Sequence, residues 1–157
     1  MNPEIPAAPR PQTIAHLSDL HLGRSPREFS AASALCDALQ KSVVDHVIVT
    51  GDVVDHGRDA EFAQFIEVFR TFQDAGQLTI VPGNHDRLGD AVARTMMDGL
   101  RVDFVRRPGL FILRIDTTGP HNRFFLAGHG KIDEAVIDEA DRLLTNAGTE
   151  DLVVVAL

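Results

Sequence analysis

Three short clusters of polar residues in this 157-residue sequence carry side chains that can bind a metal ion. Asp19 and His21 form an Asp-x-His pair, Asp52 follows a glycine, and Asn84 stands in the run Gly-Asn-His-Asp at 83–86. Carboxylate, imidazole and amide ligands together suit first-row divalent ions such as Mn, Fe or Zn better than a magnesium-only site. The residue types therefore favour transition-metal chemistry, although an isolated Asp-x-His is more typical of a surface turn.

The third cluster also contains groups for proton transfer. Histidine can gain or lose a proton near neutral pH, so His85 is a candidate general acid and Asp86 is a candidate to orient its ring. A polar turn with a structural histidine would produce the same four residues. The cluster becomes more informative because two other clusters precede it in the chain.

Each cluster follows a short apolar segment that predicts a β-strand. These segments lie at residues 13–17, 47–50 and 78–81, and the second is apolar throughout, as expected of a parallel strand covered on both faces. The stretches between them predict two helices, one capped by Ser25 and one capped by Asp59. Because the carboxyl ends of parallel strands meet at one edge of a sheet, the three clusters are expected to converge there.

Taken together, the three clusters resemble the first three signature blocks of the calcineurin-like metallophosphoesterases. The surrounding runs, Ser-Asp-Leu-His-Leu-Gly and Val-Pro-Gly-Asn-His-Asp, are similar to the cyclic-nucleotide-phosphodiesterase-like branch. The resemblance implies an α/β fold, a four-layer α/β/β/α sandwich with a two-metal centre between its sheets. Asp19 and His21 would bind the first divalent ion, and Asp52 would bridge both ions. Asn84 would bind the second ion, and His85 would be the acid near the leaving group.

The same resemblance implies a metal-dependent phosphohydrolase and, within that class, a phosphodiesterase acting on a small phosphorylated substrate. A hydroxide held between two ions would attack phosphorus in line, opposite the leaving oxygen. The run Asp-His-Gly at 55–57 departs from the Asp-Arg-Gly of the phosphoprotein phosphatases, which argues against protein phosphatase activity. Two alternatives remain open. One is a catalytically incomplete fragment that persists as a folded or partner-completed module, and the other is a nuclease of the DNA-repair branch, which shares the run Asp-Leu-His-Leu-Gly.

Beyond the third cluster, the chain fits the same topology. Three strands are predicted there, at 102–105, 110–115 and 124–127. Two helices are also predicted: a short one capped by Asp90 that ends near Gly99, and one opened by Asp133 and closed by Gly148. The final apolar run, 152–156, predicts one more buried strand. Residues 1–12 hold four prolines and predict an extended lead-in, so the metallophosphoesterase domain is expected at 13–157.

The resemblance also predicts histidines that this sequence lacks. The family has a histidine just beyond the strand at 152–156 and later a Gly-His-x-His block, and neither is present. His129 lies before the last helix and lacks the second histidine, so it and His121 are expected to be loop residues. We therefore expect the chain to be the N-terminal part of a longer enzyme or a truncated product, with the C-terminal part of the sandwich missing and little activity by itself.

Composition and charge narrow the function classes. A net charge of −8 argues against general binding to a nucleic-acid backbone, which needs clusters of Lys and Arg. No apolar run approaches the roughly 20 residues of a membrane span, and the N-terminus has no apolar signal core. The single cysteine, Cys36, excludes an internal disulfide, fits the apolar face of the first helix and favours a cytoplasmic protein.

Overall fold

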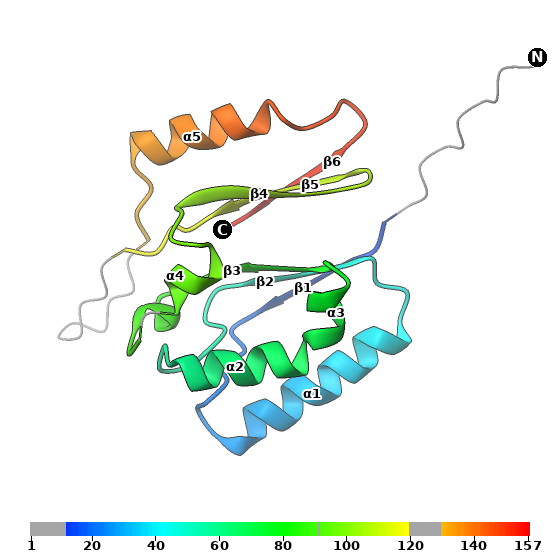
Figure 1. Cartoon of the computed structure of the whole chain (residues 1–157), viewed down its shortest axis with the longest axis vertical. Coiled ribbons are helices and arrows are strands. Elements are labelled where there is room, and N and C mark those ends of the chain that lie inside the picture. The colour runs from blue at the N-terminus through cyan, green and yellow to red at the C-terminus, as the bar shows by residue number, and fades with distance from the viewer. Residues whose placement is uncertain (1–11, 91, 120–129) are drawn as a thin grey trace, which may run out of the picture.

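Two β-sheets lie face to face in this protein, with helices on both outer sides (Figure 1). The computed structural model describes residues 12–90, 92–119 and 130–157. In chain order, the elements are β1 (Ile14–Ser18), α1 (Pro26–Lys41), β2 (His46–Thr50), α2 (Asp59–Val68), α3 (Arg70–Asp74), β3 (Leu78–Val81), the 3₁₀ helix η1 (His85–Arg87), α4 (Ala93–Met96), β4 (Val102–Arg107), β5 (Leu110–Ile115), α5 (Glu134–Leu144) and β6 (Leu152–Ala156). Helices α1 to α3 cover the outer side of one sheet, and α5 covers the outer side of the other. The predicted α/β/β/α layering is confirmed.

The first sheet consists of β1, β2 and β3 in that order, and all three strands are parallel. Their carboxyl ends are aligned, because Ser18 pairs with Thr50 and Thr50 pairs with Val81. Helices make the crossovers between the strands, as right-handed parallel connections require. Each of the three polar clusters therefore begins at the same edge of this sheet.

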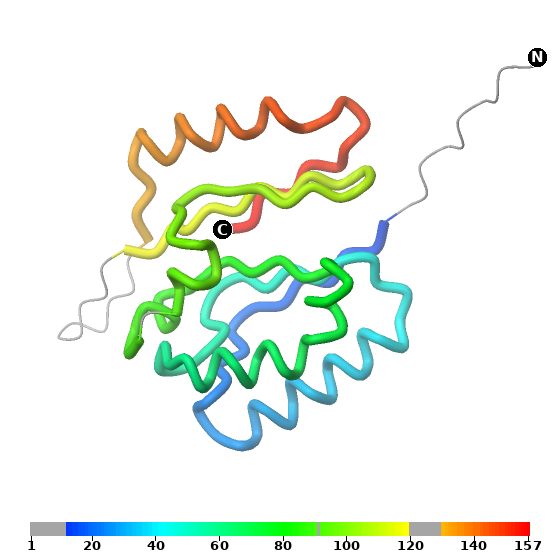
Figure 2. The backbone as a smooth tube through the Cα atoms, in the orientation of Figure 1, coloured from blue at the N-terminus to red at the C-terminus, as the bar shows by residue number. Residues whose placement is uncertain are grey.

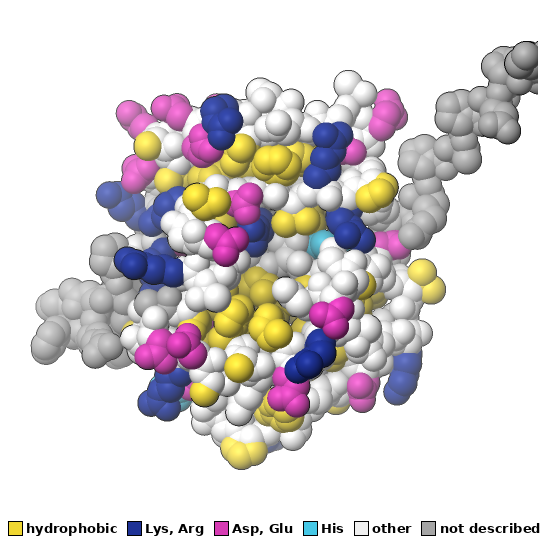
Figure 3. All heavy atoms as spheres, viewed as in Figure 1, with side chains coloured by type: hydrophobic (Ala, Val, Ile, Leu, Met, Phe, Trp, Pro, Cys, Tyr) yellow, Lys and Arg dark blue, Asp and Glu magenta, His cyan; other side chains and the backbone are white. Residues whose placement is uncertain are grey.

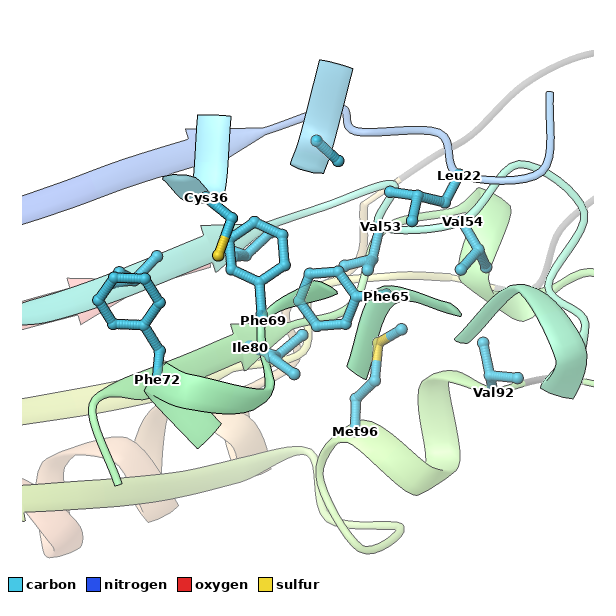
Figure 4. Packing of buried hydrophobic residues seen from close by; sticks show 13 residues of the cluster. Leu22, Cys36, Val53, Val54, Phe65, Phe69, Phe72, Ile80, Val92 and Met96 are labelled. Atoms are coloured by element: carbon cyan, nitrogen blue, oxygen red, sulfur yellow. The ribbon is translucent and has the colours of Figure 1, made fainter. Parts of the chain in front are cut away.

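The first sheet and helices α1 to α3 form the first half of the molecule, and the second sheet and α5 form the second half. The core of the first half lies between the first sheet and its helices (Figure 4). Phe65 and Phe69 are fully buried, and their stacked rings have centroids 4.9 Å apart. Cys36 is also buried in this cluster, and burial raises the pKa of its thiol. The prediction of Cys36 as a core residue is confirmed.

The second sheet consists of β4, β5 and β6 and is mixed. A turn at Pro108 and Gly109, where Gly109 has a φ of 72°, joins β4 to β5 as an antiparallel pair. The sixth strand pairs with β5 in parallel. Helix α5 begins after Asp133, as predicted, and the side chain of Asp133 caps it by accepting the backbone N–H of Val136 (3.1 Å).

The strand at 152–156 exists, but the prediction that it is buried is wrong. Leu152, Val153 and Val155 are exposed by 51%, 43% and 48%, respectively. Helix α5 packs over β4 and β5, whereas β6 lies at the edge of the sheet. An all-apolar run predicts cover on both faces, and within the described part of the chain no element supplies that cover.

Two predicted helix caps also need correction. Asp59 is the first residue of α2, and Arg58 holds the cap position. Asp90 was predicted to cap the helix that follows it, but its carboxylate instead accepts the backbone N–H of Asp59 (3.1 Å), while the next helix begins at Ala93. Asp90 therefore stabilises the start of α2 from a distant part of the chain, which local sequence patterns do not reveal.

Several predictions fall outside the described residues. They are the strand at 124–127, the loop positions of His121 and His129, and the lead-in at 1–11. Within the described ranges, no helix combines the length and apolar character needed to cross a membrane.

Candidate metal centre

The loops that follow β1 and β2 are joined by their backbones at the carboxyl edge of the first sheet. The N–H of Asp19 donates to the carbonyl of Gly51 (3.2 Å), and the N–H of His21 donates to that of Asp52 (2.9 Å). Asp19, His21 and Asp52 have φ angles of 56°, 47° and 46°, a region that non-glycine residues rarely occupy. Strained backbone of this kind concentrates at functional sites. Among the described residues, three of the four non-glycine residues with positive φ thus belong to the sequence motifs, and the fourth is Asp98.

Asp19, His21 and Asp52 bring their side chains to one point. The Nε2 of His21 lies 3.9 Å from Oδ1 of Asp19 and 3.8 Å from Oδ2 of Asp52, and the three ligand atoms lie within 4.8 Å of one another. Ligands that bind one ion at about 2.1 Å lie at most about 4.2 Å apart, so both distances from His21 suit a shared ion. Two carboxylates and an imidazole fit a divalent metal.

A residue that sequence reasoning missed lies against the ring of His21. The buried Nδ1 of His21 lies 2.9 Å from Oδ1 of Asp55, at ion-pair distance but without hydrogen-bond geometry, and Nε2 faces Asp19 and Asp52. A carboxylate on the second nitrogen of a histidine ligand fixes the ring and raises its basicity. Asp55 also accepts the Nε–H of Arg24 (3.0 Å). The signals for Asp55 in the sequence were the run Asp-His-Gly at 55–57 and its place in the same loop as Asp52.

Asn84 lies in the loop after β3, at the same edge of the first sheet. It lines a hollow of about 300 Å³ together with Asp19 and Asp52. The loop approaches Asp52 so closely that a Cβ on Gly83 would lie 2.2 Å from its backbone nitrogen, which explains the glycine. The N–H of His85 donates to Oδ1 of Asp52 (2.9 Å), so the other carboxylate oxygen, Oδ2, is the one that faces His21.

His85 is half-buried beside this hollow, and its ring orientation is fixed. Its Nδ1 lies 2.7 Å from the carbonyl oxygen of Asp55. Because a carbonyl oxygen only accepts, Nδ1 carries the proton in this contact and Nε2 is left for a substrate. The ring also packs edge-on against His21, with centroids 4.8 Å apart. The arrangement is compatible with proton donation from Nε2.

The prediction that Asp86 orients His85 is wrong. The carboxylate of Asp86 is fully buried and accepts three backbone N–H groups, from Gly83 (2.7 Å), Val54 (2.9 Å) and Val53 (3.2 Å). Burial raises the pKa of Asp86 to about 6, against the opposing effect of these hydrogen bonds. Asp86 ties the loop after β3 to the loop after β2, and the carbonyl of Asp55 holds the histidine instead.

The fold and the site together define a metallophosphoesterase-type protein. The chain matches the calcineurin-like phosphoesterase family over residues 12–155, and it belongs to that family. No curated protein sequence matches it.

Two solved structures are similar to parts of the chain. One is the nuclease MPE of Pseudomonas putida, with 25% identity, 53% of this chain and 44% of that chain covered, and a TM-score of 0.38. The other is a dimetal phosphatase from Danio rerio, with 14% identity, 85% and 51% covered, and a TM-score of 0.44. The matched region amounts to about half the length of each of these proteins.

Proposed function

We propose that the protein is a metal-dependent phosphodiesterase that acts on a small phosphorylated substrate. The observation that carries the proposal is the convergence of Asp19, His21 and Asp52, from two loops, on ligand atoms within 4.8 Å of one another. Family membership supports phosphoester hydrolysis. A hollow of about 300 Å³ is at the small end of ligand sites and supports a small substrate.

The proposed site would hold two divalent ions. Asp19 and His21 would bind one ion, Asn84 would bind the other, and Asp52 would lie between them. The mixed oxygen and nitrogen donors suit Mn, Fe or Zn. Two such ions would supply a nucleophile at neutral pH and neutralise charge on the phosphoryl oxygens. Asp55 contributes by holding the ring of His21 so that Nε2 faces the ion.

His85 is the proposed general acid. Its Nδ1 is engaged by the carbonyl of Asp55, so a proton bound at Nε2 can be delivered to the leaving oxygen. The position of the ring beside the ligand cluster supports this role. Delivery from a fixed ring requires no rearrangement at the moment the ester bond breaks.

Charge favours a small substrate over a nucleic-acid backbone. Figure 3 shows acidic and basic side chains interspersed on the face it displays, and the net charge of the whole sequence is −8. Backbone binding of nucleic acid draws its affinity from clustered Lys and Arg.

The proposal is tested by metal binding and hydrolysis measured on the same preparation. Titration calorimetry with MnCl₂ should give binding to the wild type that Asp52→Asn weakens by at least about 100-fold, because that side chain serves both ions. Asp37→Asn is the matched control, since it removes an exposed carboxylate on α1. Mn-dependent hydrolysis, which we expect to be slow for this chain by itself, should be faster for bis(p-nitrophenyl) phosphate than for p-nitrophenyl phosphate.

Three outcomes separate the alternatives. Equal Mn affinity in wild type and Asp52→Asn would remove the proposed metal site. Mn binding without hydrolysis of any phosphoester would favour the non-catalytic module. Faster hydrolysis of single-stranded DNA than of bis(p-nitrophenyl) phosphate would favour the nuclease.

A further inference from the structure

Arg87 connects the metal-ligand loop to the second sheet. It lies two residues after His85, in η1, and its side chain reaches the segment that follows β5. Its Nε donates to the hydroxyl of Thr118, and its Nη2 donates to Oδ2 of Asp116. The side chain of Asp116 is only 4% exposed, so this charge pair is largely shielded from water. A planar guanidinium can serve both partners at once, which an ammonium group cannot do in the same geometry.

The segment that Arg87 reaches is held from both sides. Oδ1 of Asp116 accepts the backbone N–H of Thr118 (2.9 Å) and its hydroxyl (2.5 Å). Arg101 adds a bond from Nη1 to the carbonyl oxygen of Thr118 (3.1 Å). The backbone of residues 116–118 is therefore fixed in place, and Arg87 is the part of this network that comes from the first half of the molecule.

The segment 116–118 forms one wall of the hollow beside the candidate metal ligands, which we call the metal hollow. Thr117 and Thr118 line the hollow that Asp19, Asp52 and Asn84 also line. The ligand side chains come from the first sheet, and the threonines come from the second. If a phosphoryl group binds at the ligand cluster, its ester substituent would therefore lie against Thr117 and Thr118, which we call the threonine wall.

We propose that Arg87 is a positioning residue that sets the threonine wall against the ligand loop, and that Thr117 contacts the ester substituent of the bound substrate. The inference rests on the proposed function. The hydroxyl of Thr118 is occupied by Asp116 and Arg87, which makes Thr117 the wall residue assigned to the substrate.

A second arginine provides a matched control. Arg114 also joins the two halves, because its Nη1 donates to the carbonyl oxygens of Met96 (3.2 Å) and Ile80 (3.4 Å), and its Nη2 pairs with Asp103. It does not line the hollow. Loss of Arg114 should perturb packing between the halves without moving the threonine wall.

The test compares two probes that differ in their ester groups. Calorimetry in saturating MnCl₂ measures the Kd of inorganic phosphate, which has no ester group, and that of dibutyl phosphate, a diester whose poor alkoxide leaving groups slow its hydrolysis. Arg87→Met should weaken dibutyl phosphate binding about 10-fold, and Thr117→Val about 3-fold, as expected for the loss of one or two modest contacts. Binding of inorganic phosphate should change less than 2-fold in both variants, and Arg87→Lys should restore only part of the diester affinity.

The outcomes distinguish this inference from the proposed function. Wild-type protein that binds neither probe with Mn would overturn the proposed function, and the inference with it. Phosphate binding with unchanged dibutyl phosphate affinity in Arg87→Met would overturn the inference alone. An equal loss of diester affinity in Arg114→Met would also overturn it, because a general loosening of the two halves would then explain the effect. Thr117→Val retains every described side-chain bond of the wall and covers the case in which Arg87→Met does not fold.

Discussion

The two sheets of this protein differ in how their strands are connected, and the difference decides which side chains can meet. The strands β1, β2 and β3 are parallel, so all three end at one edge and their following loops lie together. The strands β4 and β5 form a hairpin, so their ends point to opposite edges. The first sheet consequently brings three loops to the metal hollow, whereas β5 brings the single segment 116–118. Parallel topology thus assembles a site from residues far apart in sequence.

The two halves also fix their loops by different means. In the first half, backbone hydrogen bonds and the buried carboxylate of Asp86 tie the loops together. In the second half, the segment 116–118 is held by side chains, those of Arg101 and of Arg87, which reaches it from the first half. The C-terminal residue of the sequence lies between the two sheets (Figure 2), and this residue, Leu157, also lines the metal hollow. The first half therefore supplies the reactive groups, and the second half supplies a wall.

The largest expected effect concerns the proposed acid of the first half. In a preparation with Mn-dependent turnover, His85→Ala should lower kcat by about 10²–10⁴-fold for alkyl esters with poor leaving groups. Nitrophenyl esters should lose much less, because their leaving oxygen is already stable as an anion. Steady-state kinetics with both ester types measures the difference, and His16→Ala, which removes an exposed histidine on β1, is the control. Equal losses on both ester types would remove His85 from the acid role.

The second effect concerns a buried histidine at the opposite end of the first sheet. His46 is 1% exposed, its Nε2 lies 2.7 Å from the hydroxyl of Thr79, and burial, with Arg107 nearby, lowers its pKa to about 4. The unfolded chain binds a proton at this residue near pH 6.5 and the folded chain does not, so His46 should destabilise the fold increasingly as the pH drops from about 6.5 to about 4, by up to about 3 kcal/mol. Asp86, whose pKa is raised to about 6, has the opposite effect over the lower part of this range, because the folded state binds its proton first.

Urea unfolding at a series of pH values measures this effect. Relative to the wild type, His46→Gln should gain stability as the pH drops from 6.5 to 4, because the destabilising contribution of His46 is removed. His16→Gln is the control, because His16 makes the same 2.7 Å contact, with Thr50, at an exposed position. A His46→Gln variant with the wild-type slope would show that other groups carry the pH dependence.

A third comparison uses two carboxylates, each paired with arginine, one in each half. Asp55→Asn should weaken Mn binding by about 10–100-fold, because the partner that orients His21 loses its charge. Asp103→Asn removes the carboxylate that pairs with Arg114 in the second sheet and should leave Mn affinity unchanged. Calorimetric titration with MnCl₂ measures both variants. A similar loss in Asp103→Asn would indicate that the metal site depends on general stability.

The smallest expected effect compares the loss of unfolding free energy at a buried position of the first sheet with that at an exposed position of the second. Val49→Thr places a hydroxyl in the fully buried centre of the first sheet and should lower the free energy of unfolding by about 1–3 kcal/mol. Val153→Thr, on the exposed edge strand β6, should change it by less than about 0.5 kcal/mol. Urea unfolding measures both values. A large loss at Val153 would reveal that β6 is covered in solution.

The sequence predicted well what depends on local pattern and strand order. Apolar runs located the strands of both sheets that lie in the described residues, and the parallel connections placed Asp19, His21 and Asp52 at one edge, where the structure brings them together. Asn84 was predicted at the same edge as part of the third cluster, and the structure puts it in the same hollow. Their roles as metal ligands stay a proposal.

The sequence did not predict features that depend on which distant group faces a side chain. Adjacency suggested that Asp86 serves His85, but the turn directs the carboxylate to the loop after β2. Asp90 likewise caps a helix that precedes it in the chain. Burial of β6 was predicted from its apolar residues, and burial depends on what covers a strand as well as on its composition.

The left-handed backbone at Asp19 sets folding against function at that position. Asp19 has a φ of 56° and a side chain that is 68% exposed, so glycine there would relieve strain and remove few contacts. We expect a library of variants selected only for soluble, folded protein to enrich glycine at residue 19, and selection for metal binding to restore aspartate. Divergent enrichment under these two selections would show that natural selection has retained a residue that the fold alone disfavours.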